Sequence, residues 1–255
     1  MDKVVIDNSK CVGCGKCVMD CVASSLYLDG KKAKFREGCI ECGHCFAVCP
    51  TGAIDMPEYD TSESIPAVSM SEIDSDILLS AMKSRRTIRQ YKNIPVEQEK
   101  IDKIIEAGRY APTGANSQNV AFTVLGSKQA ALEKECVKLF RTGVGIGSVF
   151  SKSLKNQNID DNFFFKKAPL VIVVSAHNTV NGTLASAYME IEANSLGLGV
   201  LYSGFFCGCT KLNPKIKAML NLPKGHKAVT CMIIGYPDVE YKRSAPRKPH
   251  KTQTL

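Results

Sequence analysis

Residues 39–50 read CIECGHCFAVCP, and this stretch decides how the first part of the chain folds. Its four cysteines have the spacing C-x2-C-x2-C-x3-C, and a proline follows the last of them. Residues 11–21, CVGCGKCVMDC, have the same spacing. Iron–sulfur clusters are held by thiolates spaced in this way. The two matched runs therefore predict two 4Fe–4S clusters.

The spacing also predicts which cysteine binds which cluster, because in two-cluster proteins the fourth cysteine of each run binds the cluster of the other run. One cluster is then held by Cys11, Cys14, Cys17 and Cys49, and the other by Cys21, Cys39, Cys42 and Cys45. The alternative is a structural zinc site, for which four ligands from two C-x2-C pairs would suffice. Eight cysteines in two matched runs exceed that need.

Three further observations, two in this region and one on the remaining cysteines, carry expectations. Val22 stands where a proline usually follows the fourth cysteine, which removes no ligand. His44 is expected to face solvent, since thiolates fill all eight ligand positions. The other four cysteines form no such run and are expected to be small buried apolar residues; they are Cys136, Cys207, Cys209 and Cys231. A redox role stays open for Cys207 and Cys209.

The cysteine runs lie inside an internal repeat. VVIDNSKCVGCGKCVMDCVASSLYLD is followed by AKFREGCIECGHCFAVCPTGAIDM, and each half has a strand-like stretch, a cysteine loop and a second such stretch. The halves are expected to pack around a pseudo-twofold axis, with the clusters supplying folding energy. Residues 57–71, PEYDTSESIPAVSMS, have the composition of a linker. We therefore expect a two-cluster domain at 1–58, a linker at 59–71 and a second domain at 72–255.

Helices and buried strands alternate loosely in the second domain. The apolar spacing predicts helices over 73–83, 96–111, 128–141 and 183–196, and another that starts at Pro214 with Asn213 as its N-cap. Strands are expected at 120–127, 169–176 and 228–237, the second of them covered on both faces. The last eighteen residues are expected to form an extended arm. No G-x-G-x-x-G follows a strand, and GVGIG at 143–147 is interpreted as a mobile loop.

The charge of the chain is unevenly distributed. The formal net charge is +8, yet residues 1–56 hold seven basic and seven acidic residues, so the whole excess lies in the second part. Such an excess suits an anionic cofactor, an acidic partner or nucleic acid. Nucleic acid is not expected, because no zinc-finger or RNA-binding pattern is present. No apolar run reaches the ~18 residues of a membrane span, and MDKVVIDNSKC lacks the apolar region of a secretory signal. We expect a cytoplasmic protein.

Three stretches of the second domain could bind a cofactor. SRRTIRQY (84–91) offers Arg85, Arg86, Thr87 and Arg89 to a phosphate, although alone it could be a solvated helix end. APTGANSQNVAF (111–122) could meet a heterocycle edge through the carboxamides of Asn116 and Gln118, or could be an ordinary turn. GLGVLYSGFF (197–206) could let a backbone N–H approach a flat ring at Gly204, or could be a helix end that leads into a strand.

In this order, and with GYPDVEYKRSAPRKP (235–249) after them, these stretches resemble the nitroreductase family of FMN oxidoreductases. The whole chain resembles the subgroup in which a two-cluster ferredoxin domain precedes the flavin domain. The resemblance implies an α+β protein with an α/β sandwich dimer domain and FMN at the subunit interface.

The resemblance also implies site residues. The phosphate would be bound by Arg85, Arg86, Thr87, Arg89 and Arg243, with Lys242 and Arg247 nearby. Asn116 and Gln118 would meet the ring edge, and Ser203, Gly204 and Phe205 would lie near flavin N5. Gly204 stands where many members carry an acidic residue, so the substrate preference linked to that residue does not carry over.

The expected function is reduction of nitroaromatic-like or other conjugated electron-poor acceptors by FMN. The resemblance and the fused cluster domain imply electrons from reduced ferredoxin or an NAD(P)H-linked reductase. No catalytic side chain is predicted, because water or the flavin can supply the proton. Two alternatives stay open: an electron-transfer module of a larger complex, and a reductive dehalogenase or enoate-type reductase on the same scaffold.

Overall fold

The computed structural model describes residues 2–143 and 158–255, which fall into two units. The first comprises Met1–Ile73 with Gly114–Ser117, and the second comprises Asp74–Thr113 with Gln118–Leu255. Apart from Gly143, the loop expected at 143–147 lies outside the described residues. In the described part of the chain, no helix is both long and apolar enough to cross a bilayer.

The first unit has the internal symmetry that its sequence repeat predicts. Its elements are β1 (Val5–Ile6), α1 (Lys16–Met19), β2 (Leu26–Asp29), β3 (Lys32–Phe35), α2 (His44–Val48) and β4 (Ile54–Asp55). The outer strands β1 and β4 pair antiparallel, as do the inner strands β2 and β3, so each half pairs with the other. Gly15 and Gly43 precede α1 and α2 with φ of 73° and 75°. A left-handed conformation suits glycine, which explains why both runs have glycine before their third cysteine.

The core of the first unit is small. The buried members of its core cluster are Val4, Cys11, Cys17, Leu26, Ala33, Cys45, Ala53 and Ile54. Three of these eight are cysteines, so apolar packing alone offers little stabilisation. Short 3-10 turns follow at Thr61–Glu63 and Met70–Glu72.

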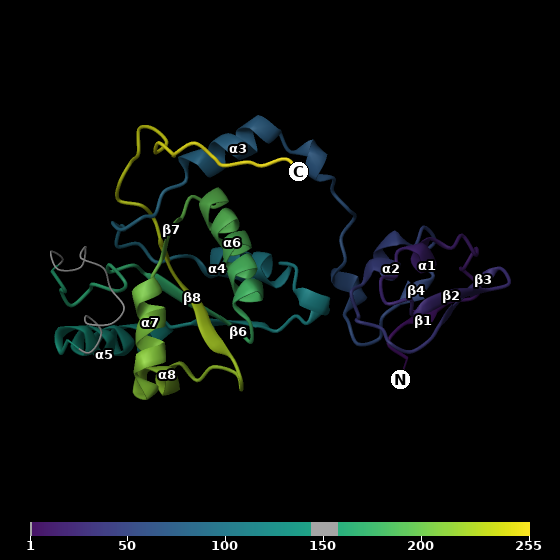
Figure 1. Ribbon diagram of the computed structural model, residues 1–255, viewed down its shortest axis with the longest axis horizontal. Helices are drawn as coiled ribbons and strands as arrows, with labels where there is room; N and C mark the ends of the chain where they lie inside the picture. Colours follow the sequence, from purple (N-terminus) through teal and green to yellow (C-terminus); the bar gives the residue numbers. More distant parts are fainter. Residues whose placement is uncertain (1, 144–157) are drawn as a thin grey trace. The chain divides into compact units, whose positions relative to one another are not determined.

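The second unit is an antiparallel sheet covered by helices on both faces (Figure 1). Its strands are β5 (Val120–Val124), β6 (Leu170–Ala176), β7 (Gly199–Tyr202) and β8 (Lys227–Gly235), in the order β5-β6-β8-β7. Its helices are α3 (Ser75–Ser84), α4 (Gln98–Arg109), α5 (Gln129–Arg141), α6 (Thr179–Ser195), α7 (Gly204–Leu212) and α8 (Pro214–Leu220). A 3-10 turn at Gly126–Lys128 leads into α5.

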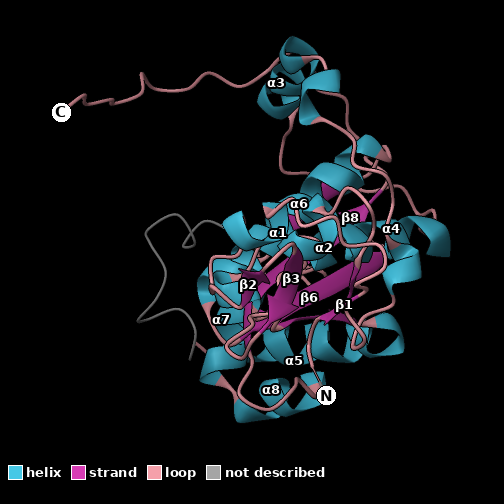
Figure 2. Ribbon diagram, turned by 90° about the vertical axis from the view of Figure 1, so that its right-hand side faces the viewer, coloured by secondary structure: helices cyan, strands magenta, loops and turns pink. Residues whose placement is uncertain are grey.

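Strand β6 lies at the centre of both cores. Leu170, Ile172 and Val174 pack with α4 and α6, whereas Val171 and Val173 face α5, α7 and α8. In Figure 2, α6 lies above β6 while α5 and α8 lie below it. All seven residues of β6 are buried, which confirms that this strand is covered on both faces.

Two elements differ from the sequence prediction. Helix α6 begins at Thr179 rather than Thr183, because Asn178 caps it by accepting a hydrogen bond from the Asn181 N–H. The stretch 197–206 does contain a helix end that leads into a strand, β7, but helix α7, which the sequence analysis did not predict, begins directly after it at Gly204. The predicted cap of α8 is confirmed: Asn213 accepts from the Lys215 N–H, and Pro214 occupies the first turn.

Candidate cofactor sites

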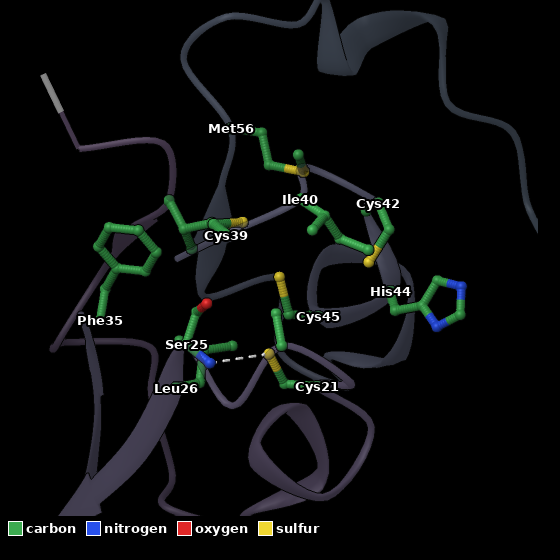
Figure 3. A pocket seen from close by; sticks show the side chains of 13 residues that line it. Cys21, Ser25, Leu26, Phe35, Cys39, Ile40, Cys42, His44, Cys45 and Met56 are labelled. Atoms are coloured by element: carbon green, nitrogen blue, oxygen red, sulfur yellow. Dashed lines mark hydrogen bonds between the residues drawn. The ribbon is translucent and has the colours of Figure 1, made fainter. Parts of the chain in front are cut away.

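The first unit contains two cavities that are each lined by four cysteines. One is lined by Cys11, Cys14, Cys17 and Cys49. The other is lined by Cys21, Cys39, Cys42 and Cys45, whose sulfur atoms face a common space in Figure 3. These are the two sets that the crossed-ligand rule predicts, and each includes one cysteine from the other half of the repeat.

The His44 ring points away from these sulfur atoms (Figure 3). Its Nδ1 lies 3.4 Å from Asp20 Oδ2, and its side chain is 60% exposed. Among the described residues, no three His, Cys, Asp or Glu side chains are placed to hold a single metal ion.

Backbone amides approach the sulfur atoms in both cavities. Ser25 N donates to Cys21 Sγ at 3.2 Å and Glu41 N to Cys39 Sγ at 3.3 Å. In the other cavity, Ala33 N donates to Cys11 Sγ at 3.4 Å and Ala53 N to Cys49 Sγ at 3.3 Å. Hydrogen bonds to sulfur tune the potential of a bound cluster.

Two buried thiols of this unit, Cys45 and Cys17, have raised pKa values. Burial raises the pKa of Cys45 to about 11, and the thiols of Cys39 and Cys42 add to this. Burial, followed by the thiols of Cys49, Cys11 and Cys14, raises the pKa of Cys17. Four thiolates gathered without a counter-charge would repel one another, so the donor set fits a bound iron cluster, which supplies that charge.

The arginine stretch of the second unit is held against β7. Ile88 is buried, and its N–H donates to Val200 O at 3.1 Å. A Cβ at Gly199 would lie only 2.3 Å from Ile88 Cγ1, so glycine is required for this approach. Anchoring at Ile88 leaves Arg85, Arg86 and Thr87 half-buried and Arg89 exposed.

The C-terminal segment starts beside the same stretch. Lys92 N donates to Tyr236 O and Asp238 N to Gln90 O, both at 2.9 Å. Beyond Asp238 the described chain forms no helix or strand, as expected for an arm. Arg243 is exposed on this arm.

The predicted ring-facing residues lie at the start of α7 and in the loop before β5. Ser203 is the N-cap residue of α7, and its N–H donates to Cys231 O at 2.8 Å. A Cβ at Gly204 would have no protein atom within 4 Å, so the backbone there faces open space that a flat ring could fill. Phe205 stacks on Phe163 with ring centroids 5.8 Å apart.

Asn116 belongs to the first unit, where its Nδ2 donates to Glu41 O at 2.8 Å. Gln118 belongs to the second unit, and its N–H donates to Thr113 Oγ1 at 3.0 Å. Ala115, Asn116 and Gln118 all have left-handed backbone, with φ between 45° and 51°. Three such residues in four positions are uncommon outside functional loops. A contact of this loop with a cofactor stays a prediction.

The four cysteines outside the runs are buried in one core of the second unit, as predicted. Burial raises the pKa of Cys207 to about 12, so this thiol stays protonated at neutral pH. Because the thiolate is the reactive form, this argues against a redox role for Cys207.

One charged residue near the arginine stretch was not predicted. Glu190 of α6 forms an ion pair with Arg85, with 2.8 Å between Oε1 and Nη1. In the sequence it is marked only as one of two acidic residues in the rather apolar stretch AYMEIEAN (187–194).

Comparisons with known proteins agree with this architecture. Residues 3–50 match a 4Fe-4S dicluster domain. A ferredoxin of Pyrobaculum islandicum is 40% identical over 65 residues, which cover 25% of this chain and 61% of that protein. The two-cluster N-terminal domain expected from the sequence is thus confirmed at the level of the domain family.

The rest of the chain has relatives of its own. An NADPH-dependent oxidoreductase of Staphylococcus haemolyticus is 24% identical over 187 residues, which cover 69% of this chain and 71% of that protein. A solved nitroreductase with bound FMN from Bacteroides fragilis covers 72% of this chain and all of that one, with a TM-score of 0.58 and 23% identity. The expected fold is confirmed by this likeness. The family model described as "Nitroreductase family" matches residues 82–236, which are more than half of the chain. The protein therefore belongs to the nitroreductase family.

Proposed function

We propose that this protein is an FMN-dependent oxidoreductase that reduces a small electron-poor acceptor, of the nitroaromatic or another conjugated type, with electrons relayed through two 4Fe–4S clusters. The observation that carries the proposal is the pair of four-cysteine cavities in a chain of the nitroreductase family. When bound, the clusters supply single electrons and FMN supplies two-electron reduction.

The chain contributes ligands, orientation and charge. Cys11, Cys14, Cys17 and Cys49 would hold one cluster, and Cys21, Cys39, Cys42 and Cys45 the other. Guanidinium forks suit a phosphate, so the phosphate-binding set would be Arg85, Arg86, Thr87, Arg89 and Arg243. Amides at the start of α7, at Gly204 and Phe205, would stabilise negative charge on a ring placed in the open space there. Asn116 and Gln118 would supply amide donors and acceptors to its edge.

The functional unit would be a homodimer in which both subunits contribute to each flavin site. Helix α6 supports this through a stripe of exposed apolar residues on one face. The stripe consists of Val180, Leu184, Tyr188 and Ile191, which are between 38% and 66% exposed. A contiguous exposed apolar stripe marks an interaction site, and the family resemblance points to a second copy as its partner. The electron donor would be reduced ferredoxin or an NAD(P)H-linked reductase.

The test of the proposal is the reduction of bound FMN by reduced ferredoxin, followed anaerobically by absorbance. A variant lacking residues 1–60 should bind FMN yet lose this reduction, because the expected entry route is gone. Chemical reduction of its FMN by dithionite is the control for an intact flavin site. Undiminished reduction by ferredoxin in the truncated variant would contradict the proposal.

Product analysis separates the alternatives. Turnover of a nitroaromatic compound by the isolated dimer supports the proposed reductase. Release of halide from a halogenated aromatic compound, without nitro reduction, would favour a reductive dehalogenase instead. Failure to turn over any small acceptor while cluster and flavin still exchange electrons would favour an electron-transfer module.

A further inference from the structure

Arg85 is the first arginine of the stretch 84–91, and it already has a partner. Its Nη1 donates to Oε1 of Glu190 at 2.8 Å. The two side chains are 31% and 13% exposed, so the pair is largely removed from solvent. A partly buried ion pair restricts both side chains more than a pair on the surface does.

Glu190 is itself held in a rigid setting. It lies in the middle of the 17-residue helix α6, and its backbone carbonyl accepts a hydrogen bond from Asn194 Nδ2 at 2.6 Å. Tyr202, the last residue of β7, lies next to the carboxylate. Burial, followed by the negative charge of Glu190, raises the pKa of the Tyr202 hydroxyl, which donates to Ser186 O at 2.8 Å. The carboxylate is therefore fixed between a helix and a strand.

This setting leaves part of the Arg85 guanidinium available. The group has five N–H donors, and the contact with Glu190 uses one of them. An arginine side chain has substantial rotamer entropy, which a phosphate would otherwise have to restrict on binding. A guanidinium that is already oriented loses less of this entropy.

We propose that Glu190 is a positioning residue that orients the Arg85 guanidinium for the phosphate of FMN. This inference rests on the proposed function, in which Arg85 binds that phosphate. Glu190 itself would not touch the cofactor. Its effect should therefore require both Arg85 and the phosphate.

The experiment compares FMN with riboflavin, which has the same ring but no phosphate. Dissociation constants for both are measured by flavin fluorescence on full-length protein stripped of flavin. In Glu190→Ala, FMN should bind about tenfold more weakly while riboflavin affinity is unchanged. Glu190→Gln should show a smaller loss of FMN affinity, because its amide oxygen can still accept from Arg85. Circular dichroism checks that both variants are folded, and the isosteric Gln variant provides the test if the Ala variant is not.

Two further comparisons test whether the loss of FMN affinity is specific to Glu190 and acts through Arg85. Glu192→Gln, two residues away on the same helix, should leave both affinities unchanged. In an Arg85→Ala background, which itself should weaken FMN binding, adding Glu190→Ala should cause no further loss.

Three results would overturn the inference. Equal weakening of FMN and riboflavin by Glu190→Ala would indicate a general structural role. Additive losses in the double variant would show that Glu190 does not act through Arg85. If Arg85→Ala leaves FMN affinity unchanged, the phosphate assignment on which the inference rests is wrong, and that outcome is distinct from a failure of Glu190 alone.

Discussion

Gly199 and Gly204 lie five residues apart, and their surroundings differ. A Cβ at Gly199 would clash with Ile88 in the segment that carries the arginines. A Cβ at Gly204 would meet no protein atom within 4 Å. The first glycine is therefore required by the fold, whereas the packing of the chain does not require the second.

The pair of glycines gives a direct prediction at the residue scale. Gly199→Ala should lower the free energy of unfolding by about 1–3 kcal/mol, because Ile88 must move. Gly204→Ala should not destabilise the protein, since alanine favours a helix, but it should weaken FMN binding by placing a methyl group in the open space. Thermal unfolding and flavin fluorescence measure the two effects. Full FMN affinity in Gly204→Ala would contradict the placement of the ring.

Glu133 predicts a pH dependence. It is buried in α5, where its Oε1 accepts from the N–H groups of Phe164 and Phe165 at 3.1 and 2.8 Å. Burial raises its pKa above the ordinary value of 4.5, although the two hydrogen bonds oppose this. The native state then holds a proton more tightly than the unfolded state does. The free energy of unfolding therefore falls as pH rises from about 4.5 to the raised pKa, and is level above it.

Glu133→Gln should remove this fall. The measurement is thermal unfolding of the second unit between about pH 3 and pH 7.5, a range that covers the titration of both carboxyl groups. Glu135 on the same helix is the control, because its ion pair with Lys215 lowers its pKa. Glu135→Gln should instead remove a loss of stability that occurs as pH falls. An unchanged pH profile in Glu133→Gln would show that the carboxyl group is not perturbed.

At the scale of elements, helix α6 serves the fold on one face and exposes an apolar stripe on the other. Ala185, Met189 and Ala193 are fully buried against the sheet. The exposed stripe described above starts near the N-terminus of the helix and runs through its middle. Helix α3 likewise buries none of its residues. Both observations point to surface that another subunit would cover.

The stripe on α6 can be tested by charge. The double variant Leu184→Glu and Tyr188→Glu should convert the proposed dimer to a monomer, because two carboxylates would be buried at the interface without partners. Light scattering coupled to size exclusion measures the mass. Leu212→Glu is the control, since Leu212 is a similarly exposed apolar residue at the end of α7. A dimer that persists in the double variant would place the interface elsewhere.

The elements also show where sequence reasoning succeeds and where it stops. Strand β6 was predictable because a continuous run of β-branched residues is typical of a strand that is covered on both faces. The true start of α6 was missed because Val180, Asn181 and Gly182 show no amphipathic spacing; the Asn178 cap was the available signal. Helix α7 has no polar face in GFFCGCT, so its type is decided by tertiary packing. Glu190 was missed because its role depends on Arg85, which is 105 residues away.

At the scale of the whole molecule, the two units differ in what stabilises them. The second has two large cores on either side of a four-stranded sheet. The first has two two-stranded sheets and one core cluster of eight buried apolar residues, of which three are cysteines. Sheets of this size are marginal in water, so cluster binding would supply much of the folding free energy of the first unit.

Removing iron should therefore unfold one unit and spare the other. After anaerobic chelation, amide hydrogen exchange should become fast throughout residues 1–58 and stay slow in β6 and β8. Reconstitution with iron and sulfide should restore protection, which is the control for irreversible damage. Protection of β2 and β3 that survives complete loss of iron would show that the apolar core suffices alone.

Each half of the first unit contributes one cysteine to the cavity of the other half, and this bears on the evolutionary origin of the unit. Cys49 lies in the cavity of the first half and Cys21 in that of the second, so neither half encloses four thiols by itself. An ancestral gene that encoded a single half would have needed two identical copies, each lending one thiol to the other. Duplication and fusion would then have joined an existing symmetric pair. The matched glycines before α1 and α2 and the reciprocal strand pairing are the features expected of that history.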